Sequence, residues 1–148
     1  MKKEFIILIC ISAAVVLLLY IMFVRVEDNQ SNGIEWHGEQ QIDRGYETEY
    51  IAIPGISDMS FVKNQTSQYV NIHNPKENNC SMNFSLVMDD GFVLWSETNI
   101  QPGYGLYKIA INKLLPVGQY NCLLVVECFS QNGSPLNGCT LEVKVVVR

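Results

Sequence analysis

Cysteine is the residue type of this chain whose spacing offers the clearest chemistry. Cys80, Cys122, Cys128 and Cys139 lie in the C-terminal part, while the fifth cysteine, Cys10, lies inside an N-terminal apolar run. Thiols can pair as disulfides, bind zinc, act as nucleophiles or lie buried as small apolar groups. Which of these applies depends on the elements that hold the four side chains.

Alternating patterns place the cysteines on β-strands. From Cys80 to Leu86 apolar and polar side chains alternate, which is typical of a half-buried strand. Asp89–Asp90–Gly91 predicts a hairpin turn, because Asp-Gly accepts the positive φ angles of tight turns. Further runs with a two-residue period lie at 69–73, 92–95, 107–111, 120–129 and 139–147. The sequence therefore predicts six or seven short strands and no amphipathic helix, in an all-β antiparallel β-sandwich.

The predicted strands bring three of the cysteines together. Cys122 and Cys128 on one strand would stand ~20 Å apart, far beyond the ~4.4–6.8 Å Cα separation of a disulfide. A hairpin joined by 130–137 places Cys139 near Cys128, and an antiparallel partner strand that starts at Cys80 also begins near Cys128. We expect a Cys80–Cys128 disulfide, with Cys128–Cys139 as the rival pair and four buried free thiols as the alternative.

The other polar residues predict neither a catalytic site nor a metal site. No C-x-x-C pair occurs, and His37 and His73 lie in unrelated segments, so we expect no zinc and no other cofactor. Asp89 and Asp90 are adjacent carboxylates, but their place in an Asp-Gly turn identifies them as turn formers. No G-x-S-x-G elbow or glycine-rich phosphate loop is present. The sequence therefore predicts a protein that is not an enzyme.

An apolar run near the N-terminus predicts where the protein lies. Residues 5–24 are twenty in succession without a charged side chain, enough for a helix to cross the ~30 Å hydrocarbon core of a bilayer. Lys2 and Lys3 precede the run, so the positive-inside rule places the N-terminus in the cytoplasm and the rest of the chain outside. The run is too long for a cleaved signal peptide and lacks an A-x-A-like site. We expect an uncleaved signal anchor in the cell membrane.

The chain is predicted to have three parts. They are a transmembrane signal anchor (1–24), a polar stalk or linker (25–50) and an exported β-sandwich domain (51–148). Trp36, in the linker, is an aromatic side chain that could dock onto the domain. Residues 25–148 carry a net charge of −6, which argues against a nucleic-acid partner and against binding to anionic lipid head groups.

Two stretches resemble parts of the immunoglobulin fold. Gly118–Gln119–Tyr120–Asn121–Cys122 resembles strand F, in which a tyrosine closes a corner near the cysteine. Trp95 follows Cys80 by fifteen residues, which is similar to the step from the strand-B cysteine to the core tryptophan. The resemblance implies an immunoglobulin-like sandwich and, by analogy, a Cys80–Cys122 pair. The interval of 42 residues between these two cysteines is short for that family.

A second resemblance covers residues 53–147. Its turns occur in the order Ile53–Pro54–Gly55, Asn74–Pro75, Asp90–Gly91, Pro102–Gly103 and Pro135–Leu136–Asn137–Gly138. Together they resemble a set of small exported, membrane-anchored proteins of Gram-positive bacteria. The resemblance implies a location in the cell envelope and a compact β domain, and it brings no catalytic residue.

These features predict a protein that binds rather than catalyses. One anchor, one stalk and one small domain favour a module that contacts another envelope protein, with an exposed apolar or aromatic patch as its signature. The alternative is a module that binds cell-wall carbohydrate or another small ligand through exposed aromatic residues, for which Tyr104 and Tyr107 are the candidates. Tyr107 can instead point into the core with Ile109.

Overall fold

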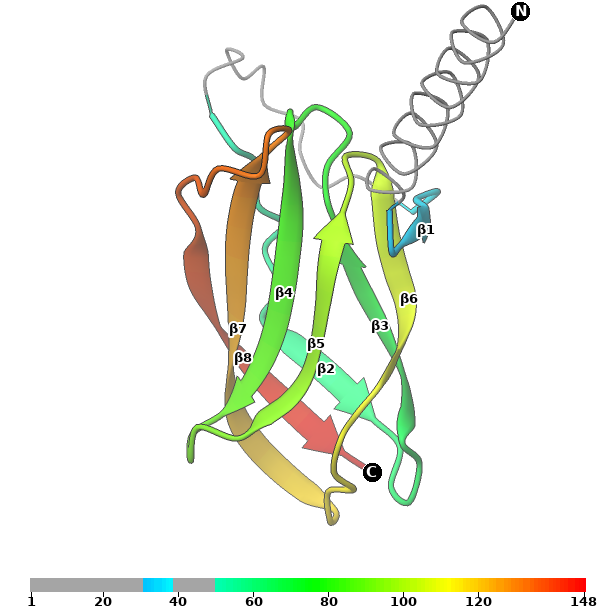
Figure 1. Ribbon diagram of the computed structural model, residues 1–148. Helices are drawn as coiled ribbons and strands as arrows, with labels where there is room; N and C mark the ends of the chain where they lie inside the picture. Colours follow the sequence, from blue (N-terminus) through cyan, green and yellow to red (C-terminus); the bar gives the residue numbers. More distant parts are fainter. Residues whose placement is uncertain (1–30, 39–49) are drawn as a thin grey trace, which may run out of the picture. The chain divides into compact units, whose positions relative to one another are not determined.

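The computed structural model describes residues 31–38 and 50–148, whose regular structure is made of β-strands (Figure 1). The strands are β1 (Ile34–Glu35), β2 (Asp58–Phe61), β3 (Ser67–His73), β4 (Cys80–Met88), β5 (Val93–Ile100), β6 (Tyr104–Ala110), β7 (Gly118–Ser130) and β8 (Cys139–Val147). Within the described residues no helix could cross a membrane. The predicted anchor lies outside them, as does most of the predicted linker.

The strands form two sheets. One sheet has the order β1-β6-β3, and the other has the order β2-β8-β7-β4-β5. Neighbouring strands are antiparallel except β2, which runs parallel to β8. The predicted all-β fold is therefore confirmed, and the two sheets are consistent with a β-sandwich.

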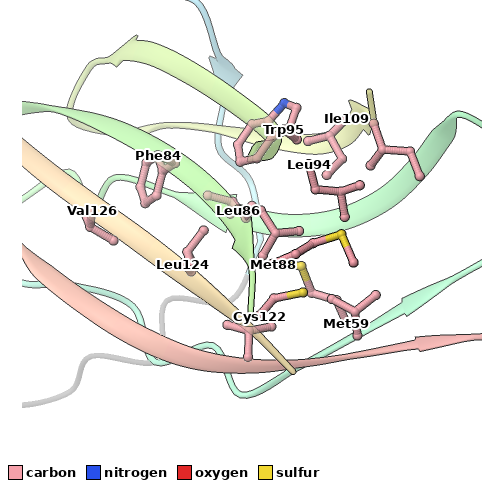
Figure 2. Close-up of a cluster of buried hydrophobic side chains, with 14 of the residues drawn as sticks. Met59, Phe84, Leu86, Met88, Leu94, Trp95, Ile109, Cys122, Leu124 and Val126 are labelled. Atoms are coloured by element: carbon pink, nitrogen blue, oxygen red, sulfur yellow. The ribbon is translucent and has the colours of Figure 1, made fainter. Parts of the chain in front are cut away.

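Strict alternation along the strands builds the hydrophobic core. Every second residue of β4 is buried, from Cys80 to Met88, because successive side chains of a strand point to opposite faces. The three-stranded sheet contributes Ile72 and Ile109 to the same cluster. Figure 2 shows side chains of β2, β4, β5, β6 and β7 within it. Trp95 is among the buried residues, as predicted.

The predicted turns at Asp89–Asp90–Gly91 and Pro102–Gly103 are present. In the β4–β5 hairpin Gly91 has a φ of 84°, and the Met88 N–H donates to the Phe92 carbonyl at 2.9 Å. The predicted tyrosine corner is also present, since the Tyr120 hydroxyl donates to the Pro116 carbonyl at 2.9 Å. These contacts fix where β5 and β7 begin.

A buried asparagine ties the loop after β3 to the strands around it. The Asn74 side-chain amide donates to the carbonyls of Cys80 and Ile100, at 2.8 and 2.9 Å. Its Oδ1 accepts a hydrogen bond from Asn78 at 2.8 Å. Because these buried polar groups satisfy one another, the network fixes the backbone at the start of β4.

Candidate functional site

Three cysteines meet on the core face of the five-stranded sheet. Met82 of β4 lies opposite Cys128 of β7, so Cys80 is a diagonal neighbour of Cys128. Cys139 of β8 lies opposite Val126 and is the diagonal neighbour of Cys128 on the other side. Cys128 is therefore the central thiol. The predicted gathering of these three cysteines at one end of the sheet is confirmed.

The protonation of this thiol cluster follows from its burial. Its cysteines are free, and Cys80 and Cys128 are diagonal neighbours on β4 and β7. Burial, with the neighbouring sulfurs of Cys80 and Cys139, raises the pKa of Cys128 to about 12. Burial also raises the pKa of Cys139. Because the thiolate is the reactive form, these thiols are poor nucleophiles at neutral pH. The Cys80–Cys128 disulfide stays a prediction.

Cys122 lies apart from the thiol cluster, on the edge of a surface hollow of about 590 Å³. Asp58 and Lys144, at paired positions of β2 and β8, also line this hollow. Burial, and then the charges of Asp89 and Asp90, raise the pKa of Cys122. The hollow therefore offers polar contacts of mixed charge and no activated thiol.

Residues 31–38, part of the predicted linker, lie on the three-stranded sheet. β1 pairs with β6, and the Trp36 N–H donates to the Gly103 carbonyl at 2.8 Å. The Trp36 ring lies between those of His73 and Tyr107, with centroid distances of 4.5 and 4.4 Å and interplanar angles of 9° and 11°. In this stack Trp36 is only 8 % exposed and His73 only 4 %. Trp36 thus docks onto the domain, as its aromatic ring allows.

Gly105 lies directly against the stack, and two ring nitrogens of the stack have no hydrogen-bond partner among the described residues. A Cβ at Gly105 would lie 2.5 Å from Cε3 of Trp36 and 2.7 Å from Cβ of His73, so only glycine leaves room for the stack. The buried Trp36 Nε1 and His73 Nδ1 have no hydrogen-bond partner among the described residues. Burial lowers the pKa of His73, and Glu77 acts in the opposite sense. The imidazole is therefore neutral at neutral pH.

The two candidate ligand-contact tyrosines differ in accessibility. Tyr104 is exposed and lies opposite Glu35 of β1. Tyr107 is half-buried because Trp36 covers its ring, and its hydroxyl accepts the His37 N–H at 3.0 Å. Tyr104 is thus the more accessible of the two, and a role of either residue in ligand binding stays a prediction.

Exposed apolar side chains lie on the β4–β5 hairpin and on the β6–β7 loop, at the end of the domain far from β1. Phe92 and Val93 follow the β4–β5 turn, and Leu114 and Val117 lie between β6 and β7, as the lower end of Figure 1 shows for these loops. Their exposed fractions run from 39 % at Phe92 to 64 % at Val117. The Asn112 amide joins the loops by donating to the Val93 carbonyl at 3.2 Å. We name these four apolar residues the apolar loop surface.

Sequence reasoning missed the partners of Trp36. The linker has no periodicity that would relate Trp36 to a particular strand. The one sequence feature that could have indicated the docking site was Gly105, a glycine inside the strand that holds Tyr107. Such a glycine often marks a place where another part of the chain approaches closely. Among residues 31–38 and 50–148, no three His, Cys, Asp or Glu side chains gather as ligands of one metal ion would.

Comparison with known proteins identifies no family for this chain. No protein-family model matches the chain, and no curated protein sequence matches it significantly. The resemblances to immunoglobulin strands and to exported proteins of Gram-positive bacteria therefore stay predictions.

Proposed function

We propose that this protein is a single-pass, membrane-anchored extracellular module that binds another protein of the cell envelope and has no catalytic activity. The observation that carries the proposal is the apolar loop surface. An exposed cluster of large apolar side chains is typical of protein contact sites, because burying it against a partner removes it from water.

The position of the apolar loop surface also favours this role. β1 pairs with the start of β6, whereas Leu114 follows the end of β6, so the surface and residue 31 lie at opposite ends of the domain. The chain therefore enters the domain at the end opposite the surface. Lys113, whose ammonium lies 5.4 Å from the centroid of the Phe92 ring, adds a positive charge beside it. Asp90, which accepts the Phe92 N–H at 2.9 Å, and the adjacent Asp89 add negative charge on the same turn. An apolar partner surface with a rim of both signs fits this combination best.

Two finer features belong to the same proposal. The domain is an immunoglobulin-like sandwich, which the Tyr120 corner and the buried Trp95 support. Outside the cytoplasm the neighbouring thiols of Cys80 and Cys128 can be oxidised to a disulfide, which would contribute roughly 2–5 kcal/mol to a domain of this size.

Site-specific crosslinking in cells tests the proposal. A photoreactive amino acid replaces Val117 in the full chain, and the matched control carries it at Leu136, which is 41 % exposed in the β7–β8 loop. We expect one envelope protein to be captured from position 117 and not from position 136. Leu114→Ser in the crosslinking chain should reduce the capture.

Two outcomes would overturn the proposal. Equal capture of the same abundant neighbours from both positions means that the loops have no specific protein partner. Retention of wall glycan by the full chain, lost with Tyr104→Ala and unaffected by Leu114→Ser, means that the carbohydrate alternative is correct.

A further inference from the structure

The stack of Trp36, His73 and Tyr107 has a property that simple docking does not require. It buries the imidazole of His73 almost completely and leaves its Nδ1 without a hydrogen-bond partner among the described residues. A hydrophobic residue would stack on Trp36 without that cost. A histidine at this place makes the docking of residues 31–38 depend on a group that titrates near neutral pH.

We propose that the stack is a pH-sensitive latch, which holds residues 31–38 on the domain while His73 is neutral and releases them when His73 takes up a proton.

Two effects of opposite sign act on the protonated imidazole. Attraction between a cation and the face of Trp36 favours the charged ring. Removal from water disfavours it, and protonation would also leave a charged N–H at Nδ1 that has no acceptor among residues 31–38 and 50–148. Burial is the largest influence on this group and lowers its pKa from 6.5, so the desolvation of the cation dominates.

The neighbouring charges do not reverse this balance. Glu77 favours the protonated ring, but its effect is smaller than that of burial. In the docked segment the carboxylate of Glu35 lies 3.9 Å from the imidazole of His37, and both residues are largely exposed. The elements packed around His73 carry these ionisable groups: Glu35 and His37 of the docked segment, Tyr69 of β3 itself, Tyr104, Tyr107 and Lys108 of β6, and Lys76 and Glu77 of the β3–β4 loop.

The sign of the pH dependence follows from linkage. In the docked state His73 binds a proton more weakly than an ordinary histidine, whose pKa is 6.5, and release that exposes its ring to water returns the pKa toward that value. Docking is therefore strongest above pH 6.5 and weakens as the pH falls below 6.5 toward the lower pKa of the docked state. Release is expected in mild acid, before carboxylates elsewhere in the domain are protonated.

Release would change how far the domain reaches from the membrane, a consequence that rests on the proposed anchor. Six residues (25–30) separate the predicted anchor from the docked segment, a span of at most about 20 Å. After release, 25 residues (25–49) precede the next described part of the domain, with a limit of about 80–90 Å. The latch itself does not depend on the anchor, so its test stands if the proposed function fails.

The two histidines of the chain give a matched pair of variants. His73→Phe keeps a flat ring beneath Trp36 but cannot be protonated, whereas His37→Gln removes the exposed histidine of the docked segment. The full chain in detergent micelles, with Trp95→Phe so that Trp36 is the only tryptophan, is titrated from pH 7.5 to pH 4.5 while tryptophan emission and iodide quenching are recorded. Amide hydrogen exchange of residues 31–38 in the chain that keeps Trp95 provides the same readout if the Trp95 variant does not fold.

We expect a reversible red shift and an increase in quenching of Trp36 with a midpoint below pH 6.5, retained in His37→Gln and absent in His73→Phe. A disulfide between Glu35→Cys and Tyr104→Cys, at paired positions of β1 and β6, should also abolish the change by clamping the segment. The proposal is overturned if the transition persists in His73→Phe, if it is lost in His37→Gln, or if Trp36 stays docked until the whole domain unfolds.

Discussion

Replacement of Gly105 by alanine tests the account of the Trp36 stack most directly. The new Cβ would lie 2.5 Å from Trp36, 2.7 Å from His73 Cβ and 2.7 Å from the carbonyl oxygen of Ile72. Real Cβ atoms do not approach so closely, so the ring and the strand must both move. The matched control is Gly55→Ala, because a Cβ at Gly55 meets nothing within 4 Å.

The magnitude follows from which contacts can be relieved. If Trp36 detaches, its clash with the new Cβ disappears, but the large ring is no longer buried. The free energy of unfolding that this clash can cost is therefore at most the free energy of docking Trp36. The contact with the Ile72 carbonyl remains, because it belongs to the paired backbone of β3. Overpacking of this kind costs roughly 1–3 kcal/mol, and we expect Gly105→Ala to lower the free energy of unfolding by about 2 kcal/mol. Gly55→Ala should leave it unchanged or raise it by up to about 1 kcal/mol.

Urea unfolding of the full chain in detergent micelles measures both variants, and Trp36→Ala completes a double-mutant cycle. Since Trp36 and Gly105 are in contact, the double variant should lose less stability than the sum of the two single variants, by about 0.5 kcal/mol or more. Equal stabilities of Gly105→Ala and Gly55→Ala, within about 0.5 kcal/mol, would show that the stack does not form as described.

Four further perturbations follow from the hydrogen-bonded polar groups and the thiols. Asn74→Ala leaves two strand carbonyls without their donor and should cost at least about 2 kcal/mol in urea unfolding. Tyr120→Phe removes the hydrogen bond of the corner and should cost about 1 kcal/mol without a change in the slope of the unfolding curve. With a pKa of about 12, Cys128 should resist alkylation at pH 8 in the folded chain and react about tenfold faster for each unit of pH gained, as mass spectrometry of iodoacetamide-treated protein would show. Mild oxidation should join Cys80 to Cys128 and leave Cys122 free, which peptide mapping with trypsin and a glutamate-specific protease can establish.

The strands of the five-stranded sheet could be predicted because their information is local. The alternation from Cys80 to Met88 defines the faces of β4, and the turn at Gly91 defines where its partner begins. The same local signals locate β7 and β8 around the long loop at 131–138. With those registers known, the meeting of Cys80, Cys128 and Cys139 follows.

The three-stranded sheet was less predictable because irregular pairing governs it. The period of two grouped Tyr107 with Ile109 on one face, but Tyr107 stacks on Trp36 while Ile109 lies in the core. The pairing of β3 with β6 shifts register between Tyr69 and Ile72, which breaks the alternation assumed from the sequence. The docking of Trp36 depends on that local geometry and on Gly105 in β6. Neither can be predicted from the sequence of the linker.

Strand β2 pairs with only one strand of its sheet, β8, which is synthesised near the end of the chain. Asp58 pairs with Lys144, 86 residues further along the chain, and β2 occupies the edge of the sheet. Until β8 has been made, Met59 and Phe61 have no strand to pair with, although both are buried in the finished domain. A short extended segment with apolar side chains and an open edge is the kind that other unfolded chains capture. The yield of folded protein should therefore depend on what shields residues 58–61 during that interval, more than on the stability of the finished domain.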